Sequence, residues 1–160
     1  MVRMKVKVVG IDQHSMMPVV VIADDEERGF IPIVIGPAEA NAITLQLEGI
    51  KPPRPITHDL LKSMLDSFNA KVDRVVISDL KDETYYARIF VRTKDGEVDI
   101  DARPSDAIAL ALRVQAPIYI SEEVAAKAMI TNKPIDDKEV EEFKKFLENL
   151  TPGDFEKNLK

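Results

Sequence analysis

The 160-residue chain contains no cysteine, which rules out both a disulfide framework and a thiolate metal site. Proteins of reducing compartments rarely rely on disulfides, so this composition favours a cytoplasmic location. Long hydrophobic runs are also missing, because no stretch approaches the roughly 20 apolar residues that cross a bilayer. Residues 1–7 alternate charged and apolar side chains and lack the apolar core of a signal peptide. We expect a soluble, unprocessed protein with no membrane partner.

Familiar catalytic motifs are missing too. The chain has no P-loop, no Rossmann glycine fingerprint, no nucleophile elbow and no HExxH sequence. Its chemistry must therefore come from carboxylates, arginines, hydroxyls or the two histidines. The formal net charge of −6 argues against a protein that coats nucleic acid through bulk charge. This negative charge does not exclude a nuclease, because a metal-dependent nuclease needs clustered carboxylates.

Hydrophobic residues make up 45% of the chain, enough for one core of ordinary domain size. Alternating and β-branched segments predict strands, and apolar residues at helical spacing predict helices. The predicted strands span 2–12, 18–23, 30–35, 72–80, 84–93, 97–101 and 117–120. The predicted helices span 37–48, 57–68, 107–114 and 121–128. In the first strand, we expect Val2, Met4, Val6 and Val8 to share one face.

These elements predict an α+β fold with a largely antiparallel or mixed sheet, in the order βββ-αα-βββ-α-β-α plus a C-terminal helix. The helix over 107–114 is apolar on nearly every side, so we expect it to be central and buried. Residues 1–130 are predicted to form the domain. Residues 131–160 are predicted to form a charged helical tail, docked on the domain or on a partner.

Three helix beginnings each carry an acid: Glu39, Asp59 and Asp106. Helix N-termini attract phosphate through free N–H groups and a partial positive charge. Taken singly, each acid is better explained as a partner of the helix dipole. Taken together, the three could converge at one edge of the sheet.

His58 lies beside Asp59 at the second of these beginnings, where an imidazole can act as a general base or a metal ligand. The competing interpretation is a histidine that merely packs at a helix start, and taken alone the position favours it. His14 lies in a hairpin turn and carries little functional weight.

The Asp95-Gly96 pair predicts a two-residue hairpin turn. In that register Arg92 faces Asp99, Phe90 faces Asp101, and Arg88 faces Arg103. The last pair brings like charges together unless an acid or an anionic ligand lies between them.

The same strand places Tyr86, Arg88, Phe90 and Arg92 on one face. Such interleaving of aromatic and basic residues can stack bases and hold phosphates. An ordinary solvated or partner-covered sheet face explains the pattern equally simply and is preferred.

Several segments resemble the bifunctional nuclease domain family. They are IGPAEA at 35–40, RPITHDLL at 54–61 and IDARPSDAIALA at 100–111, with VVISDL at 75–80 and TYYA at 84–87. The resemblance extends over about residues 5–124. It implies a compact α+β domain, frequent homodimers, and a family whose plant members are credited with cleaving both RNA and DNA.

We assign roles to the residues on chemical grounds. The expected catalytic residues are Glu39, His58, Asp59 and Asp101. The expected substrate-binding residues are Arg54, Arg103, Arg88 and Tyr86. Among them Glu39, Asp59 and Asp101 are candidates to hold a divalent ion, magnesium or manganese, that activates water for phosphodiester hydrolysis.

Three functions stay open from the sequence. The chain can be a metal-assisted nuclease, a non-enzymatic homodimeric interaction or regulatory module linked to nucleic-acid processing, or a nucleotide- or small-molecule-binding protein. An open cleft that gathers Glu39, Asp59, Asp101 and Arg103 would favour the first or the third. Mutual salt bridges that bury these groups would favour the second.

Overall fold

The computed structural model describes residues 1–132, 134, 140–142 and 144–145. Its seven-stranded sheet has the order β3-β2-β1-β7-β4-β5-β6. The strands are β1 (Val2–Ile11), β2 (Pro18–Asp24), β3 (Phe30–Val34), β4 (Lys71–Lys81), β5 (Thr84–Thr93), β6 (Gly96–Ala102) and β7 (Ile118–Ile120). The helices are α1 (Pro37–Leu47), α2 (Thr57–Ser67), α3 (Pro104–Val114) and α4 (Glu122–Ala128). The predicted α+β class with a mixed sheet is confirmed.

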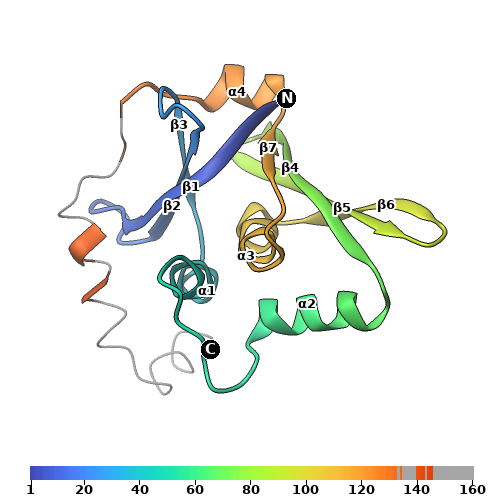
Figure 1. Cartoon of the computed structure of the whole chain (residues 1–160). Coiled ribbons are helices and arrows are strands. Elements are labelled where there is room, and N and C mark those ends of the chain that lie inside the picture. Colours follow the sequence, from blue (N-terminus) through green and yellow to red (C-terminus); the bar gives the residue numbers. More distant parts are fainter. Residues whose placement is uncertain (133, 135–139, 143, 146–160) are drawn as a thin grey trace.

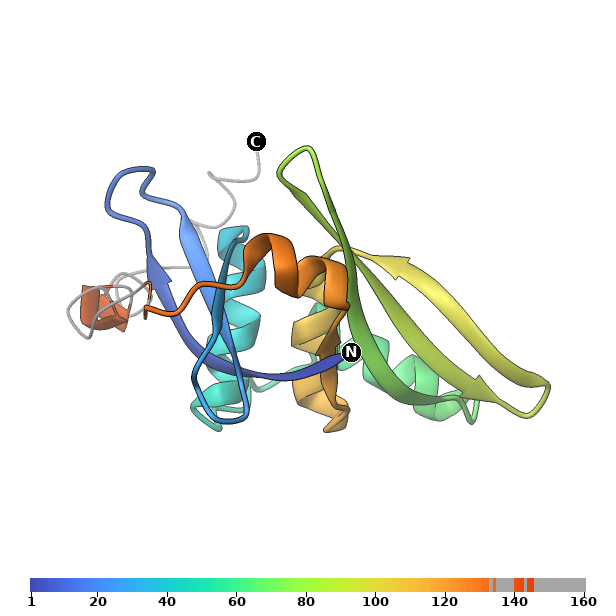
Figure 2. The same ribbon diagram turned by 90° about the horizontal axis from the view of Figure 1, so that it is seen from above.

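The short strand β7 joins two antiparallel halves of the sheet. It runs antiparallel to β1, with Val2 opposite Ile120, and parallel to β4, with Val75 opposite Ile118. One half is β1-β2-β3 and the other is β4-β5-β6. Figures 1 and 2 show the halves on either side of α1 and α3, which lie against each other between them.

Helix α3 is the central buried helix that its sequence predicts. Ala107, Ala109 and Ala111 present only methyl groups, which lets neighbouring elements pack close to the helix backbone. Ile108 and Leu110 are buried in the main core. Each of these two side chains contributes about 1.5–3 kcal/mol through burial.

Strand β1 changes the face that it buries part way along. Its register with β2 shifts between Val6 and Val8, where the strand bulges. Met4 and Val9 therefore both lie in the main core, while Val8 packs on a smaller apolar cluster. The expectation that Val8 shares the face of Met4 is wrong, because one extra residue inverts the side-chain alternation that follows it.

The β5–β6 hairpin turns one residue earlier than predicted. Thr93 pairs with Gly96, so the turn lies at residues 94–95. Gly96 has φ +120°, a conformation that favours glycine, and it occupies the exit of the turn. The dipeptide therefore predicted the hairpin correctly but not its register.

This register changes the neighbours of the charged residues. Arg88 faces Asp101, whereas the predicted register placed it opposite Arg103. Arg103 lies beyond the strand, as the residue that precedes α3. The unfavourable arginine pair does not arise. The other two expected pairings are corrected to Phe90 with Asp99 and Arg92 with Glu97.

Helix α2 leaves most of its apolar residues exposed. Leu60, Met64 and Phe68 are 54%, 49% and 77% exposed. His58 is the only residue of this helix classed as buried. Exposed apolar residues that gather in one place commonly mark a binding surface.

The predicted tail helix lies largely outside the described residues. Of its described members, Val140 packs on the smaller apolar cluster and Lys144 Nζ lies 3.5 Å from Glu48 Oε1. Within the described part of the chain, no helix is long and apolar enough to cross a membrane.

Candidate active site

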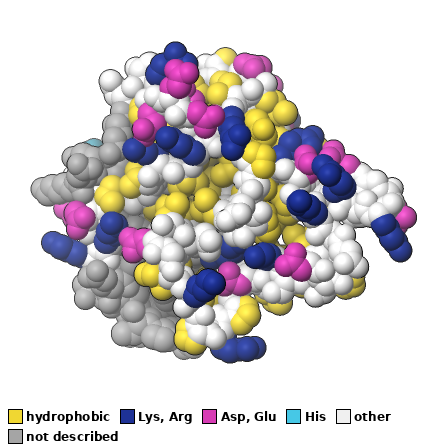
Figure 3. All heavy atoms as spheres, in the orientation of Figure 1, with side chains coloured by type: hydrophobic (Ala, Val, Ile, Leu, Met, Phe, Trp, Pro, Cys, Tyr) yellow, Lys and Arg dark blue, Asp and Glu magenta, His cyan; other side chains and the backbone are white. Residues whose placement is uncertain are grey.

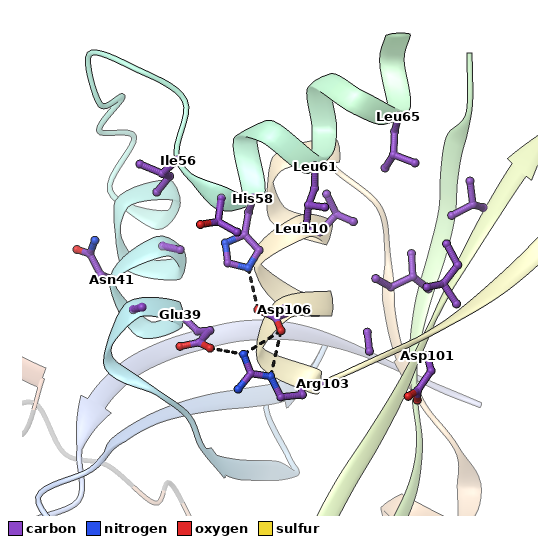
Figure 4. Close-up of a pocket in the computed structure, with 17 residues that line it drawn as sticks. Glu39, Asn41, Ile56, His58, Leu61, Leu65, Asp101, Arg103, Asp106 and Leu110 are labelled. Carbon is purple, nitrogen blue, oxygen red and sulfur yellow. Dashed lines mark hydrogen bonds and ion pairs between the residues drawn. The ribbon is translucent and has the colours of Figure 1, made fainter. Parts of the chain in front are cut away.

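A groove of about 610 Å³ separates α2 from the β5–β6 hairpin (Figure 4). Its walls are mainly aliphatic, and they include Leu61 and Leu65 of α2, Ile89 and Ile100 of the hairpin, and Leu110 of α3. One end is polar, where the N-termini of α1, α2 and α3 meet. The groove is therefore an apolar channel with a charged end.

Arg103 lies at the centre of that charged end. Its guanidinium binds the carboxylate of Glu39, from the first turn of α1, and donates from Nε to Asp106 Oδ2 at 3.1 Å. Asp106, and then Glu39, raise the pKa of Arg103 above its ordinary value. The Arg103 side chain is 68% exposed, so it can still meet an anion from solvent.

Gly36 lets Glu39 adopt this position. It precedes α1 with φ −76°, which any residue can adopt, so conformational freedom is not its role. A Cβ atom at this position would lie 2.6 Å from Glu39 Oε2. The missing side chain leaves room for the Glu39 carboxylate.

His58 reaches the same cluster from α2, as Figure 4 shows. Its Nε2 lies 3.0 Å from Asp106 Oδ1, and the residue is only 4% exposed. A carboxylate only accepts hydrogen bonds, so Nε2 carries the proton and the neutral ring has its lone pair on Nδ1. Within the described part of the chain, Nδ1 is the one buried side-chain nitrogen or oxygen without a hydrogen-bond partner.

Asp59 does not belong to the charged end, because its carboxylate binds other groups. It accepts from Arg113 Nε at 2.8 Å and from the Ile56 backbone N–H at 3.1 Å. Partial burial acts to raise the pKa of Asp59, but these two hydrogen bonds together with the positive charge of Arg113 outweigh it, so the pKa is lowered. Asp59 thus fastens the beginning of α2 to α3.

Arg113 is a residue that the sequence argument missed. It is buried, and it also donates to the carbonyl oxygens of Ala109 and Ala42 at 3.0 Å each. It therefore ties α1, α2 and α3 together. The available signal was a single cation in the otherwise apolar stretch 107–114, because a buried cation requires a partner.

The predicted metal-binding set is not brought together. Glu39 binds Arg103 and Asp59 binds Arg113, while Asp101 lies on β6 with its carboxylate away from the Arg103 cluster (Figure 4). Among the described residues, no group of three or more histidines, aspartates and glutamates is placed to hold a metal ion. The donor set does not fit a resident magnesium or manganese ion.

The remaining predicted binding residues lie away from the charged end. Arg54 lines a separate hollow on the other side of α2. Arg88 Nη1 lies 3.7 Å from Asp99 Oδ2, and the Tyr86 ring is 5.9 Å from Lys81 Nζ. Of the eight residues predicted for the site, the structure unites Glu39, His58 and Arg103 and adds Asp106, one of the three acids at helix beginnings.

Known proteins are similar in sequence to this chain. The bifunctional nuclease domain matches residues 20–133. An uncharacterized protein of Mycobacterium tuberculosis is 38% identical over 162 residues, covering 94% of this chain and 97% of that protein. Bifunctional nuclease 1 of Arabidopsis thaliana is 27% identical over 117 residues, covering 70% of this chain and 36% of the plant protein. Bifunctional nuclease 1 of Oryza sativa subsp. japonica is 26% identical over 110 residues, covering 67% and 33%. The matched segment contains the whole charged end of the groove, and the chain belongs to the bifunctional nuclease domain family.

Proposed function

We propose that this chain is a nuclease that hydrolyses phosphodiester bonds of RNA or DNA at the charged end of the groove. The observation that carries this assignment is that Asp106 binds both the exposed Arg103 and His58, whose other ring nitrogen has no hydrogen-bond partner. The plant relatives named bifunctional nuclease add support from the family.

In this scheme, His58 is the group that moves protons. Nδ1 accepts a proton from the attacking water, and Asp106 stabilises the imidazolium that forms. The water oxygen bonds to phosphorus, the bond from phosphorus to the leaving sugar oxygen breaks, and that oxygen takes up a proton from the imidazolium or from solvent. Nδ1 is buried in the free protein, so substrate binding has to open the contact around the first turn of α2.

Arg103 binds the phosphate in the same scheme. Its planar guanidinium can donate two parallel hydrogen bonds to phosphate oxygens. Glu39 holds it in place until the substrate arrives. Because the predicted carboxylates lie apart, no step is assigned to a metal ion, and the whole of the chemistry falls on these side chains.

Cleavage of fluorophore-quencher RNA and DNA oligonucleotides tests the assignment. We expect His58→Ala to reduce cleavage by about 10²–10⁴-fold, the usual contribution of a general base. His14→Ala is the matched control, since His14 lies in the exposed turn after β1. Both variants and the wild type need identical purification, with and without EDTA. Equal cleavage by all three proteins would remove His58 from the mechanism.

A second function is favoured by the exposed apolar residues of α2. Leu60, Met64 and Phe68 recur every four residues along α2 and its C-terminal end, and such an exposed apolar stripe suits a homodimeric interaction module. The cysteine-free composition supports a cytoplasmic location for either function.

A further inference from the structure

We propose that a second surface, on the side of α2 opposite the groove, binds the sugar–phosphate backbone of a nucleic acid. This surface, the α2 cation surface, consists of Lys51, Arg54, Lys62 and Lys71. The choice of nucleic acid as the partner rests on the proposed nuclease function.

The four cations border two neighbouring hollows. One, of about 400 Å³, lies beside the proline-rich loop and includes Lys51 and Arg54. The other, of about 570 Å³, reaches Lys71 at the start of β4. Both are lined by Lys62, so the two hollows lie side by side. Figure 3 shows dark blue Lys and Arg side chains around α2 and the loop that leads into it, with magenta Asp and Glu side chains beside some of them.

These cations are available to a ligand. All four are exposed, and none has an ion pair or side-chain hydrogen bond to any described residue. Arg113, which also lines both hollows, is neutralised by Asp59. Asp66 is the acid that remains among the lining residues of both hollows.

The outer face of the sheet offers a contrast. Arg92 binds Asp73, Arg74 binds both Asp73 and Glu97, and Arg88 lies near Asp99. Their charges are cancelled within the protein, so they attract a polyanion less than the α2 cation surface does. On a chain of net charge −6, such a local group of free cations is what allows a phosphate backbone to approach.

The position next to the groove adds a geometric reason. Leu65 of α2 lines both the groove and the larger hollow, so α2 is the partition between them. A helix is about 10 Å across, so a strand held on one side lies within reach of the charged end on the other. The α2 cation surface would then hold the polymer while a neighbouring nucleotide occupies the groove.

Helix dipoles provide the competing explanation for these cations. Helices α1 and α3 end at the same hollows, and lysines favour helix C-termini. In that case the cations stabilise the fold and bind nothing. Substitution of these cations distinguishes the two roles. If they bind nucleic acid, substitution weakens oligonucleotide binding; if they only stabilise helix ends, it changes only the free energy of unfolding.

Fluorescence anisotropy of a fluorescein-labelled 2′-O-methyl single-stranded oligonucleotide, measured over a salt series, tests the surface. We expect Arg54→Ala and Lys62→Ala each to lower the slope of log K against log salt by about 0.7, the value for one phosphate contact with a single strand. Lys94→Ala is the matched control, an exposed cation without an ion pair in the β5–β6 turn. It should leave the slope unchanged.

Three results would overturn the assignment: equal slopes for all variants, no oligonucleotide binding by the wild type, or binding only to phosphatidylserine vesicles. Hydrolysis of bis(p-nitrophenyl) phosphate, a diester too small to reach the α2 cation surface, separates this inference from the proposed function. If the protein hydrolyses the small diester but all variants show equal salt slopes, the α2 cation surface is refuted and the nuclease assignment stands. If the salt slopes change as expected but the protein does not hydrolyse the small diester, the nuclease assignment is refuted and the α2 cation surface stands.

Discussion

Arg113 and Asp59 form an ion pair between α3 and α2, with 2.8 Å between Arg113 Nε and Asp59 Oδ1. The two partners are unequally buried, because the arginine side chain is 4% exposed and the aspartate 31%. This inequality predicts unequal consequences when either partner is removed.

Asp59→Ala should destabilise the protein more than Arg113→Met. The first change leaves a buried guanidinium without its carboxylate, at a cost of about 3 kcal/mol. The second leaves a half-exposed carboxylate that water and the Ile56 N–H still satisfy, at a cost of about 1–2 kcal/mol. Urea unfolding of both variants measures the difference. The reverse order would show that Arg113 acts mainly through packing.

The lowered pKa of Asp59 predicts a dependence of stability on acid. In the unfolded chain this group titrates near its ordinary value of 3.8, and in the folded protein it titrates lower. Its stabilisation is therefore complete above pH 3.8 and is lost as the pH falls through the folded value. Asp59→Asn should be less stable than the wild type at pH 7, with a deficit that shrinks below pH 3.8. A deficit that stays constant across this range would contradict the assignment.

Gly36→Ala should affect activity more than stability. The new methyl group displaces the Glu39 carboxylate and frees Arg103. Because the arginine side chain is 68% exposed, water screens the ion pair, and we expect its loss to cost about 1 kcal/mol. Gly49→Ala provides the opposite case, since Gly49 has open space around it but φ +68°, which costs about 1 kcal/mol for alanine. Thermal unfolding and oligonucleotide cleavage, measured for both variants, distinguish the two effects.

Asp106→Asn tests how His58 is oriented. The amide can donate to the ring and cannot stabilise an imidazolium, so we expect kcat to fall by about 10²-fold or more. Asp101→Asn is the comparison, because that carboxylate lies away from the charged end. If Asp101→Asn abolishes cleavage and Asp106→Asn does not, the result would instead support the metal-binding role that the sequence predicted for Asp101.

Light scattering after gel filtration tests the exposed stripe of α2. If the chain is a homodimer through this stripe, Leu60→Lys with Met64→Lys should produce a monomer. Val34→Lys is a suitable control, because Val34 is an equally exposed apolar residue on the edge strand β3. A wild-type monomer, or a double variant that stays dimeric, would assign the stripe another partner.

Local rules predicted the elements of this fold well. The continuous apolar pattern of α3 requires a buried helix in any arrangement of the chain. Asp95-Gly96 requires a hairpin, but whether glycine lies within the turn or at its exit depends on how the strands pair. The bulge of β1 likewise depends on its partner strand and has no clear mark in the sequence.

The candidate site was predicted in part. Glu39, His58 and Arg103 belong to it, while the expected convergence of Asp59 and Asp101 fails because each lies in a different environment. The direction of neighbouring side chains on α2 explains why Asp59 does not join the site. His58 and Asp59 follow each other on α2 and therefore point in directions about 100° apart, one into the groove and one toward Arg113.

The sequence by itself determined the helices, the hairpins, the family and the supply of acids and arginines, because these follow from local periodicity, turn chemistry and motif. Only the tertiary structure decided which charges meet. Glu39 and Arg103 are 64 positions apart and His58 and Asp106 are 48 apart, yet both pairs form where three helix N-termini converge. Charge pairing depends on distances of a few ångströms, and those distances are set by how the helices pack on the sheet.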